Sequence, residues 1–438
     1  MRLDYQLDER LPILKSVVLG LQWAVVVTSL IIILGKVAAG AHLTQQQEQI
    51  TYLQKLFFVS ALSILVQLLW GHKLPVISGP ATIVLLGVLS SQAASVDAVY
   101  TSVMIGGLIL AILTMTGLFN LIRNLFTRRI VAVVLLLIAV TMAPTIVRLI
   151  TTEEGGVSHL ANILFALALV ALMFVLHRLL KGIWKSALIM CVMILGSVSY
   201  LVLFPGSISP LHLGEVGLVR GFFSGLITRP ALDPGVLVAF LFCYLALSIN
   251  DIGAIQSMEP LLNPANMARR VKRGMTLTGL SNVLAGFFGV IGTVNFSLSP
   301  GIVISTACAS QYALLPGALL ILALSFSPAI IDLLDSVPPV VIGCVLLYII
   351  TSQFASGLML IFQGRDQEPL DYDDAVVIGL PVLVGTVFAF LPDAVVESFP
   401  VVLRPTLGNG FVMGVASALA LEHLIFRRSR VGNGKSTS

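Results

Sequence analysis

Apolar residues recur along this chain in windows of about 20, a length that lets a helix cross roughly 30 Å of hydrocarbon. Polar and charged residues gather between the windows and are rare inside them. The pattern predicts about fourteen membrane-spanning segments, of which the third and tenth are short. The predicted ranges are 13–35, 53–70, 79–95, 98–121, 130–150, 160–177, 186–204, 233–256, 273–292, 298–310, 316–334, 339–362, 374–391 and 408–426.

The two short segments are interrupted by proline and lie at corresponding places in the two halves of the chain. Residues 74–84 are centred on Pro80, and residues 294–305 on Pro300, about half a chain later. Each begins with a stretch too extended for a helix. Such backbone is tolerated at bilayer depth only where protein or a water-filled cavity satisfies its polar groups. We therefore expect both segments in the interior, where paired interruptions indicate a transporter's binding site.

The predicted segments divide evenly between the two halves of the chain. Seven precede residue 205 and seven follow residue 233. An odd number in each half makes the second half enter the membrane from the opposite side. The predicted fold is thus an all-α polytopic membrane protein of two inverted repeats, 1–205 and 233–438, joined by residues 206–232.

Composition and charge agree with this placement in a lipid bilayer. Hydrophobic residues make up 57% of the chain and charged residues 11%, against about 25% charged in a soluble domain. Short cytoplasmic loops carry the excess of Lys and Arg, and here that excess follows the fourth, sixth, eighth and fourteenth segments. The residues are Arg123, Arg128, Arg129, Arg178, Lys181, Lys185, Arg269, Arg270, Lys272, Arg273, Arg427, Arg428 and Arg430. We expect a multi-pass protein of the plasma (inner) membrane with both termini cytoplasmic.

Several function classes are disfavoured by what the sequence lacks. It has no HExxH, no GxSxG and no P-loop, so neither an intramembrane enzyme nor ATP-driven transport is expected. Its four cysteines show no CxxC spacing, and we expect no metal site and no cofactor beyond a coupling ion, H⁺ or Na⁺. The net charge of +4 is accounted for by the loops, and no basic face with interleaved aromatics indicates nucleic acid.

Short stretches in a characteristic order occur in the first, ninth, twelfth and fourteenth segments. They are 8–12 (DERLP), 20–22 (GLQ), 273–275 (RGM), 285–289 (AGFFG), 336–343 (SVPPVVIG) and 408–410 (GNG). In this order and spacing they resemble the nucleobase/ascorbate transporter family, which includes the xanthine and uracil permeases. The resemblance runs through most of the chain.

The resemblance implies a fold of two intertwined repeats that form two domains. A core domain would comprise 13–125 and 233–335, and a gate domain 126–205 and 336–428. The core would move against the gate in alternating access, carrying a small-molecule substrate across the bilayer. A homodimer through the gate domain is implied as well.

The resemblance also implies short antiparallel strands, at about 75–78 and 294–297, that lead into half-helices. The half-helix starts would carry Pro80, Ala81, Thr82, Ser299, Pro300 and Gly301. Free N–H groups and a positive dipole end would meet a polar or anionic group there. A hydroxyl at such a start, taken alone, is more often a helix cap than a ligand.

The eighth segment departs from the family at its most informative position. The family's nucleobase-binding Glu is replaced by Asn250, and a carboxylate, Asp251, follows it. One residue is about 100° around a helix, so the two side chains point in different directions. Asn250 is read as a ligand contact or as an interhelical contact. Asp251 is read as the proton- or sodium-linked group or as a structural carboxylate that bonds the backbone.

Other departures affect the tenth, ninth and first segments. Gly301 is kept, but the two hydrogen-bonding residues of the family signature have become Leu298 and Ser299. An acidic residue is replaced by Thr278, and a histidine by Trp23, which would stack on a planar ligand or simply pack. Two further polar candidates for the site are Gln22 in the first segment and Asn295 in the second strand, where strand packing is the alternative.

Two functions fit these observations. The leading one is a secondary transporter of a nucleobase or a similar small planar solute, coupled to protons or sodium. The alternative is an anion transporter or uncoupled facilitator of the same 7+7 fold. Sulfate-type anion exchangers share that fold and also use the two half-helix starts, and the loss of the nucleobase-reading residues moves the chain toward them.

Overall fold

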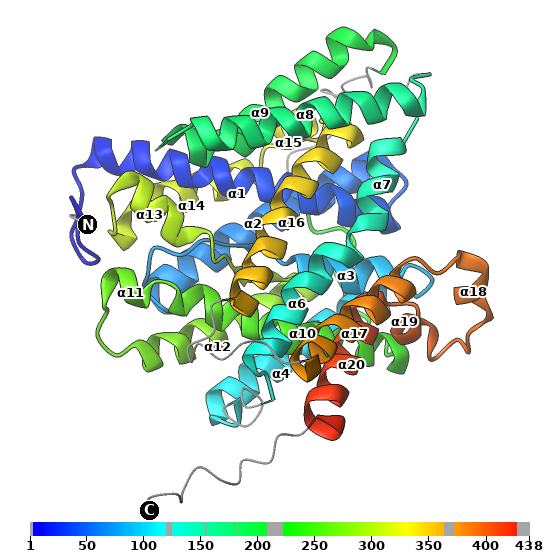
Figure 1. The fold of residues 1–438 in the computed structure, drawn as a ribbon. Helices are drawn as coiled ribbons and strands as arrows, with labels where there is room; N and C mark the ends of the chain where they lie inside the picture. The colour runs from blue at the N-terminus through cyan, green and yellow to red at the C-terminus, as the bar shows by residue number, and fades with distance from the viewer. Residues whose placement is uncertain are drawn as a thin grey trace, which may run out of the picture.

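The protein is built almost entirely of helices, as the computed structural model shows (Figure 1). The structure describes residues 3–119, 125–153, 156–181, 183–207, 222–362 and 372–426. Most of the predicted connecting segment 206–232 lies outside the described residues, as do Arg123, Arg427, Arg428 and Arg430. The longer helices are α1 (Ile13–His42), α2 (Gln46–Leu69), α4 (Val96–Thr116), α6 (Arg128–Thr141), α8 (His159–Leu179), α9 (Ile183–Leu203), α10 (Pro234–Gln256), α12 (Met267–Phe287), α16 (Pro339–Phe362), α17 (Tyr372–Ala389) and α20 (Gly410–Ala420).

Shorter elements complete the chain. They are β1 (Ser78–Pro80), α3 (Thr82–Ser90), α7 (Ala143–Thr151), η1 (Pro205–Ser207), α11 (Glu259–Leu262), β2 (Thr293–Asn295), α13 (Ser299–Thr306), η2 (Gln311–Leu314), α14 (Leu315–Leu324), α15 (Pro328–Asp335), α18 (Asp393–Ser398), α19 (Arg404–Leu407) and η3 (Leu421–Ile425). Within the described ranges, at least eight helices are long and apolar enough to cross a membrane.

Several predicted spans prove longer or less regular than the hydropathy pattern indicates. The first continues to His42, and the fifth is divided into α6 and α7. The eleventh bends by 98° between α14 and α15. Pro328 stands at the start of α15, where its missing N–H costs nothing. Hydropathy alone locates apolar windows and carries no signal for such bends.

The two proline-broken segments each consist of a short strand followed by a half-helix. The strands pair antiparallel, with Ser78 opposite Asn295 and Pro80 opposite Thr293. The predicted bounds, 75–78 and 294–297, are therefore wrong by two or three residues for β1 and by one or two for β2. Residues before β1 form a local turn, in which Val76 N–H donates to the Leu74 carbonyl at 2.7 Å.

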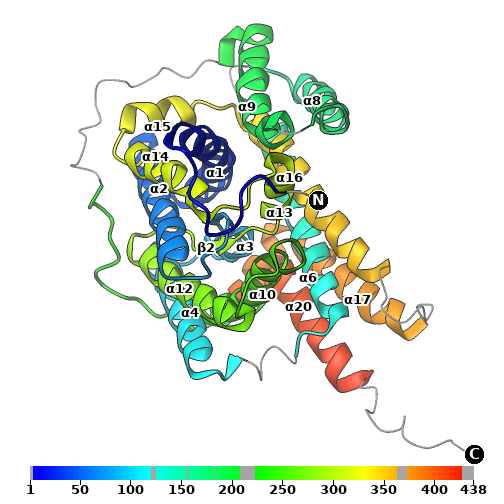
Figure 2. The same ribbon diagram turned by 90° about the vertical axis from the view of Figure 1, so that its left-hand side faces the viewer.

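The helices form two groups around the half-helices (Figure 2). In the first group α1, α2, α4, α10, α12 and α14 contact one another, with α4 lying along α12. In the second, α6 contacts α16, α17 and α20, and α8 and α9 contact α16. The half-helix α3 contacts α1 and α10 of the first group and α6 of the second, so α3 lies where the groups meet, and the strand pair packs on α1, α2, α10 and α12 of the first group.

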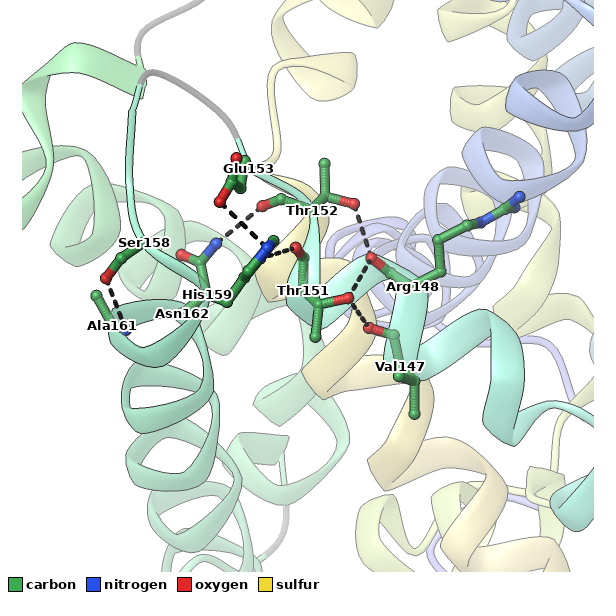
Figure 3. Close-up of polar contacts among 9 residues, drawn as sticks. All are labelled: Val147, Arg148, Thr151, Thr152, Glu153, Ser158, His159, Ala161 and Asn162. Carbon is green, nitrogen blue, oxygen red and sulfur yellow. Dashed lines mark hydrogen bonds and ion pairs between the residues drawn. The ribbon is translucent and has the colours of Figure 1, made fainter.

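The α7–α8 turn is fixed mainly by one buried amide (Figure 3). Asn162 Nδ2 donates to the Thr152 carbonyl at 2.8 Å, and the Tyr200 hydroxyl donates to Asn162 Oδ1 at 2.8 Å. The nearby pair of His159 and Glu153, at 3.1 Å, is about 60% exposed and adds little stability. Asn162 therefore connects α7, α8 and α9 into one unit.

Candidate functional site

The starts of the two half-helices lie side by side because β1 and β2 pair. Ala81 N–H donates to the Gly292 carbonyl at 2.8 Å and continues the pairing up to α3. The N-caps of α3 and α13 are Ala81 and Leu298, neither of which supplies a side-chain cap. At the start of α13 the N–H groups of Ser299 and Gly301 donate to the Phe296 and Leu298 carbonyls at 3.3 and 3.1 Å.

The two starts differ in how they are covered. Pro80, Ala81 and Thr82 are buried, so the start of α3 is enclosed by protein. At the start of α13, by contrast, Ser297, Leu298 and Gly301 are exposed. A Cβ atom placed on Gly301 would meet nothing within 4 Å. The accessible half-helix start is therefore that of α13.

Ser299 and Pro300 have structural roles at this point. The Ser299 hydroxyl accepts the Ile77 N–H at 3.0 Å and donates to the Phe296 carbonyl at 2.8 Å. It is buried and both its bonds go to backbone, so it fixes the strand against the helix. Pro300 lies in the first turn of α13, a position that needs no N–H donor.

Asn250 lies on a half-open face of α10. Its side chain is partly buried, and among the described residues its amide has no hydrogen-bonded side-chain or backbone partner beyond the helix itself. Gly253, one turn further along, is exposed, and a Cβ atom there would also meet nothing within 4 Å. Residues three apart share a helix face, so this face is free to receive a solute.

Asp251 points the other way, behind the strand pair. Its side chain is fully buried, and Oδ1 accepts both the backbone N–H and the Nδ2 of Asn295 at 2.9 Å. Asn295 Oδ1 in turn accepts a hydrogen bond from the Ser78 hydroxyl. Asp251 therefore holds β2 in register with β1, while its Oδ2 has no hydrogen-bond partner among the described residues.

The network around Asn295 extends through Thr278 to Gln67 and also includes Asn282 and Tyr244; the sequence did not single out Gln67, Asn282 or Tyr244. Thr278 Oγ1 lies 3.3 Å from Asn295 Nδ2 and accepts from Gln67 Nε2 at 3.0 Å. Asn282 Nδ2 donates to the Thr293 carbonyl at 2.8 Å, and the Tyr244 hydroxyl donates to Asn282 Oδ1 at 2.9 Å. These residues could have been found in the sequence as uncharged polar side chains inside apolar helices, because such side chains often form hydrogen bonds between neighbouring membrane helices.

Gln22 is a buried amide without a partner. It is 7% exposed, and neither Nε2 nor Oε1 has a hydrogen-bond partner among the described residues. Gly20, two residues earlier, lies against α14, where its Cβ would be 2.8 Å from Gly317 N. Two residues are about 200° of helix, so Gln22 faces away from α14. Helix α1 also contacts β1 and α3.

The predicted site residues thus fall into three sets. Asp251, Asn295 and Ser299 are joined by hydrogen bonds around the strand pair. Asn250 and Gly301 lie on open faces of α10 and α13, and Gln22 keeps an unsatisfied amide in α1. Pro80, Ala81 and Thr82 form the enclosed start of α3, and Trp23 is buried as well.

Comparison with known proteins agrees with this architecture. The sequence model of the xanthine/uracil permeases, described as a permease family, matches residues 14–418. Putative purine permease YwdJ of Bacillus subtilis (strain 168) is 22% identical over 97% of this chain and 99% of that protein. Xanthine permease XanP of Escherichia coli (strain K12) is 23% identical over 72% of this chain and 68% of that protein.

A solved structure shares the fold. The transmembrane domain of the cyanobacterium bicarbonate transporter BicA matches with a TM-score of 0.61 at 16% identity, over 87% of this chain and 97% of that one. Its likeness concerns the arrangement of helices alone. Together with the permease relatives and the apolar helices, it makes the chain a multi-pass membrane transporter and not an enzyme. The chain belongs to the xanthine/uracil permease family.

Proposed function

We propose that this transporter moves a nucleobase, xanthine-like or uracil-like, by alternating access coupled to protons or sodium. The proposal places the substrate between the open face of α10 and the start of α13. The observation that carries it is the pair of amides, the buried and unpartnered Gln22 and the partly buried Asn250 on the open face of α10. A carboxamide presents a donor beside an acceptor, which is what the edge of a nucleobase presents in return.

The two helix groups would act as the two domains that alternating access requires. The first helix group, with 13–125 and 233–335, would be the core, and the second, with 126–205 and 336–428, the gate. Fourteen spans in two inverted repeats, cytoplasmic termini in the plasma membrane and a homodimer through the gate belong to the same proposal. Contacts of α3 with both groups support a site at the boundary between them.

The buried amide of Gln22 supports a binding site beside α1, because a bound molecule there would supply the hydrogen bonds that the amide lacks. An amide buried without hydrogen bonds costs roughly 1–3 kcal/mol by protein mutational data, and buried polar groups in native proteins are nearly always bonded. A bound solute or a water molecule would supply the partner. Gln22 would then contribute most when the site is filled.

The alternative is an anion transporter or uncoupled facilitator, and one observation favours it. The start of α13 is exposed without a side-chain cap, and Asp251 faces away from it, behind β2. The positive end of a helix dipole attracts anions, and at this start it is accessible although the Ser299 and Gly301 N–H groups donate to backbone carbonyls. Among the described residues, no acidic side chain on the open face of α10 or at the start of α13 would repel an anion.

Uptake into proteoliposomes distinguishes the two functions. We expect labelled xanthine or uracil to accumulate under an inward proton or sodium gradient, and Asn250→Ala and Gln22→Ala to lower initial uptake at least about tenfold. Loss of one amide pairing costs about 1–3 kcal/mol, and 1.4 kcal/mol is tenfold. The matched control is Gln256→Ala, at the last residue of α10 and six residues beyond Asn250, which should transport as the wild type does.

Two results would decide against the nucleobase proposal. One is nucleobase uptake that does not change in Asn250→Ala. The other is gradient-independent uptake of sulfate or bicarbonate, without any nucleobase uptake, which supports the alternative.

A further inference from the structure

A second cavity lies away from the two half-helices, where α1 ends and α2 and α4 begin. Its volume is about 350 Å³, within the range of small-molecule pockets. Residues from the first half of α2, the start of α4 and the segment after residue 222 line it. None of the candidate substrate-site residues is among them.

One face of α2 runs from the mouth of this cavity to its floor. Glu48, Thr51, Tyr52 and Lys55 follow the i, i+3, i+4, i+7 spacing of a single helix face. Glu48 is exposed, whereas Tyr52 and Lys55 are each 5% exposed. Seven residues rise about 10 Å along a helix, so the exposed Glu48 lies about two turns of α2 before Lys55.

The Lys55 ammonium has no carboxylate partner among the described residues. Nζ donates to the Ser224 carbonyl, which uses one of its three N–H donors. Gly225 lies next to the ammonium, since a Cβ atom on this residue would be 3.7 Å from Nζ. Its φ of +58° favours glycine, so no side chain fills the space beside the ammonium here. A buried cation without a counter-charge is costly, and an anion in the cavity would offset that cost.

The Tyr52 hydroxyl supplies a second donor beside Lys55. Its oxygen accepts the Ile291 N–H at 3.0 Å and the Tyr100 hydroxyl at 3.3 Å. Both bonds use the oxygen as acceptor, so the Tyr52 proton is free to donate into the cavity. The cavity thus offers one buried cation and one buried hydroxyl donor from the same helix face.

We propose that this cavity is a second binding site, for a small oxyanion of the carboxylate, bicarbonate or phosphate type. The Lys55 ammonium carries the charge recognition, and the Tyr52 hydroxyl donates to a second oxygen. Charge-assisted hydrogen bonds of this kind are the strong ones. The mouth is formed by exposed polar residues of the first turn of α2, so the anion comes from solution and not from a lipid headgroup.

The test measures the thermal unfolding midpoint of the purified full chain in detergent against increasing inorganic phosphate or acetate. Chloride keeps the ionic strength constant. A ligand that binds only the folded state raises the midpoint in a saturable way. We expect a saturable rise in the wild type and in Glu48→Gln, no saturable rise in Lys55→Met, and about tenfold weaker apparent binding in Tyr52→Phe.

Phosphate also stabilises proteins without a site, so the variants decide. An equal rise in wild type and Lys55→Met would overturn the proposal, as would a wild type that shows no saturable rise. If Lys55→Met does not fold, Tyr52→Phe decides in its place, and unchanged binding there contradicts the site. A rise that needs phosphatidylglycerol nanodiscs and is absent with free phosphate would assign the cavity to lipid and overturn the solution source. The thermal unfolding measurement does not depend on transport, so its result is independent of the test of the proposed function.

Discussion

Asp251→Asn is expected to abolish gradient-driven accumulation and leave the folded protein intact, whereas Asp251→Ala is expected to destabilise the fold by about 3–5 kcal/mol. The Asn side chain can still accept the two hydrogen bonds from Asn295 through its oxygen, so β2 stays in register. Alanine leaves both donors unsatisfied in a fully buried place, at about 1–3 kcal/mol each, and removes the bonds to a charged group. The two substitutions therefore separate the structural role from the coupling role.

Accumulation in proteoliposomes and the thermal unfolding midpoint are measured on the same preparations. The matched control is Asp233→Asn, which changes a carboxylate to an amide on the same helix. Asp233 caps the start of α10 by accepting from Gly235 and Val236, and Asn caps equally well. If Asp251→Asn accumulates solute as the wild type does, Asp251 has the structural role alone.

Gly279→Leu is expected to prevent the first helix group from assembling, with a loss of more than about 3 kcal/mol in the free energy of unfolding. A Cβ atom at Gly279 would lie 2.7 Å from the Ala111 nitrogen and 2.7 Å from the Gly107 oxygen. These are backbone atoms of α4, so no side chain can move aside. Small residues allow such close approach between membrane helices, and overpacking a tight contact destabilises.

The measurement is the yield of monodisperse protein by size exclusion together with its thermal midpoint. Gly379→Leu is the matched control, since it lies inside α17 and its Cβ would meet nothing within 4 Å. Leucine favours a helix over glycine by roughly 0.5–1 kcal/mol, so the control should fold at least as well as the wild type. A Gly279→Leu protein as stable as that control would contradict the packing of α4 on α12.

Much of the fold could be predicted because apolar windows measure where helices can lie in a bilayer. Two broken segments were likewise predicted from proline and from half-chain spacing, and the family resemblance implied that each is a strand followed by a half-helix. The strand bounds could not be, since they depend on which backbone groups meet across the pair, as Phe296 N–H meets the Ile77 carbonyl. The bend between α14 and α15 depends on neighbouring helices in the same way.

The candidate site could also be predicted from the sequence only in part. Sequence spacing showed that Asn250 and Asp251 point in different directions, but only the position of β2 shows which of them is enclosed. Lys55 was overlooked because the second span was expected to begin at residue 53, which left Glu48 and Tyr52, the polar residues on its helix face, outside that span. Helix α2 begins at Gln46, and this places Glu48, Tyr52 and Lys55 on one face.

The proposed function depends on one site, where a nucleobase would bind between the open face of α10 and the start of α13. An experimental structure of the protein with saturating xanthine or uracil, whichever raises the thermal midpoint more, tests it most directly. We expect density for a planar base within hydrogen-bond distance of the Asn250 amide and beside Gly301. Base density elsewhere, or an empty site at saturating ligand, would contradict it.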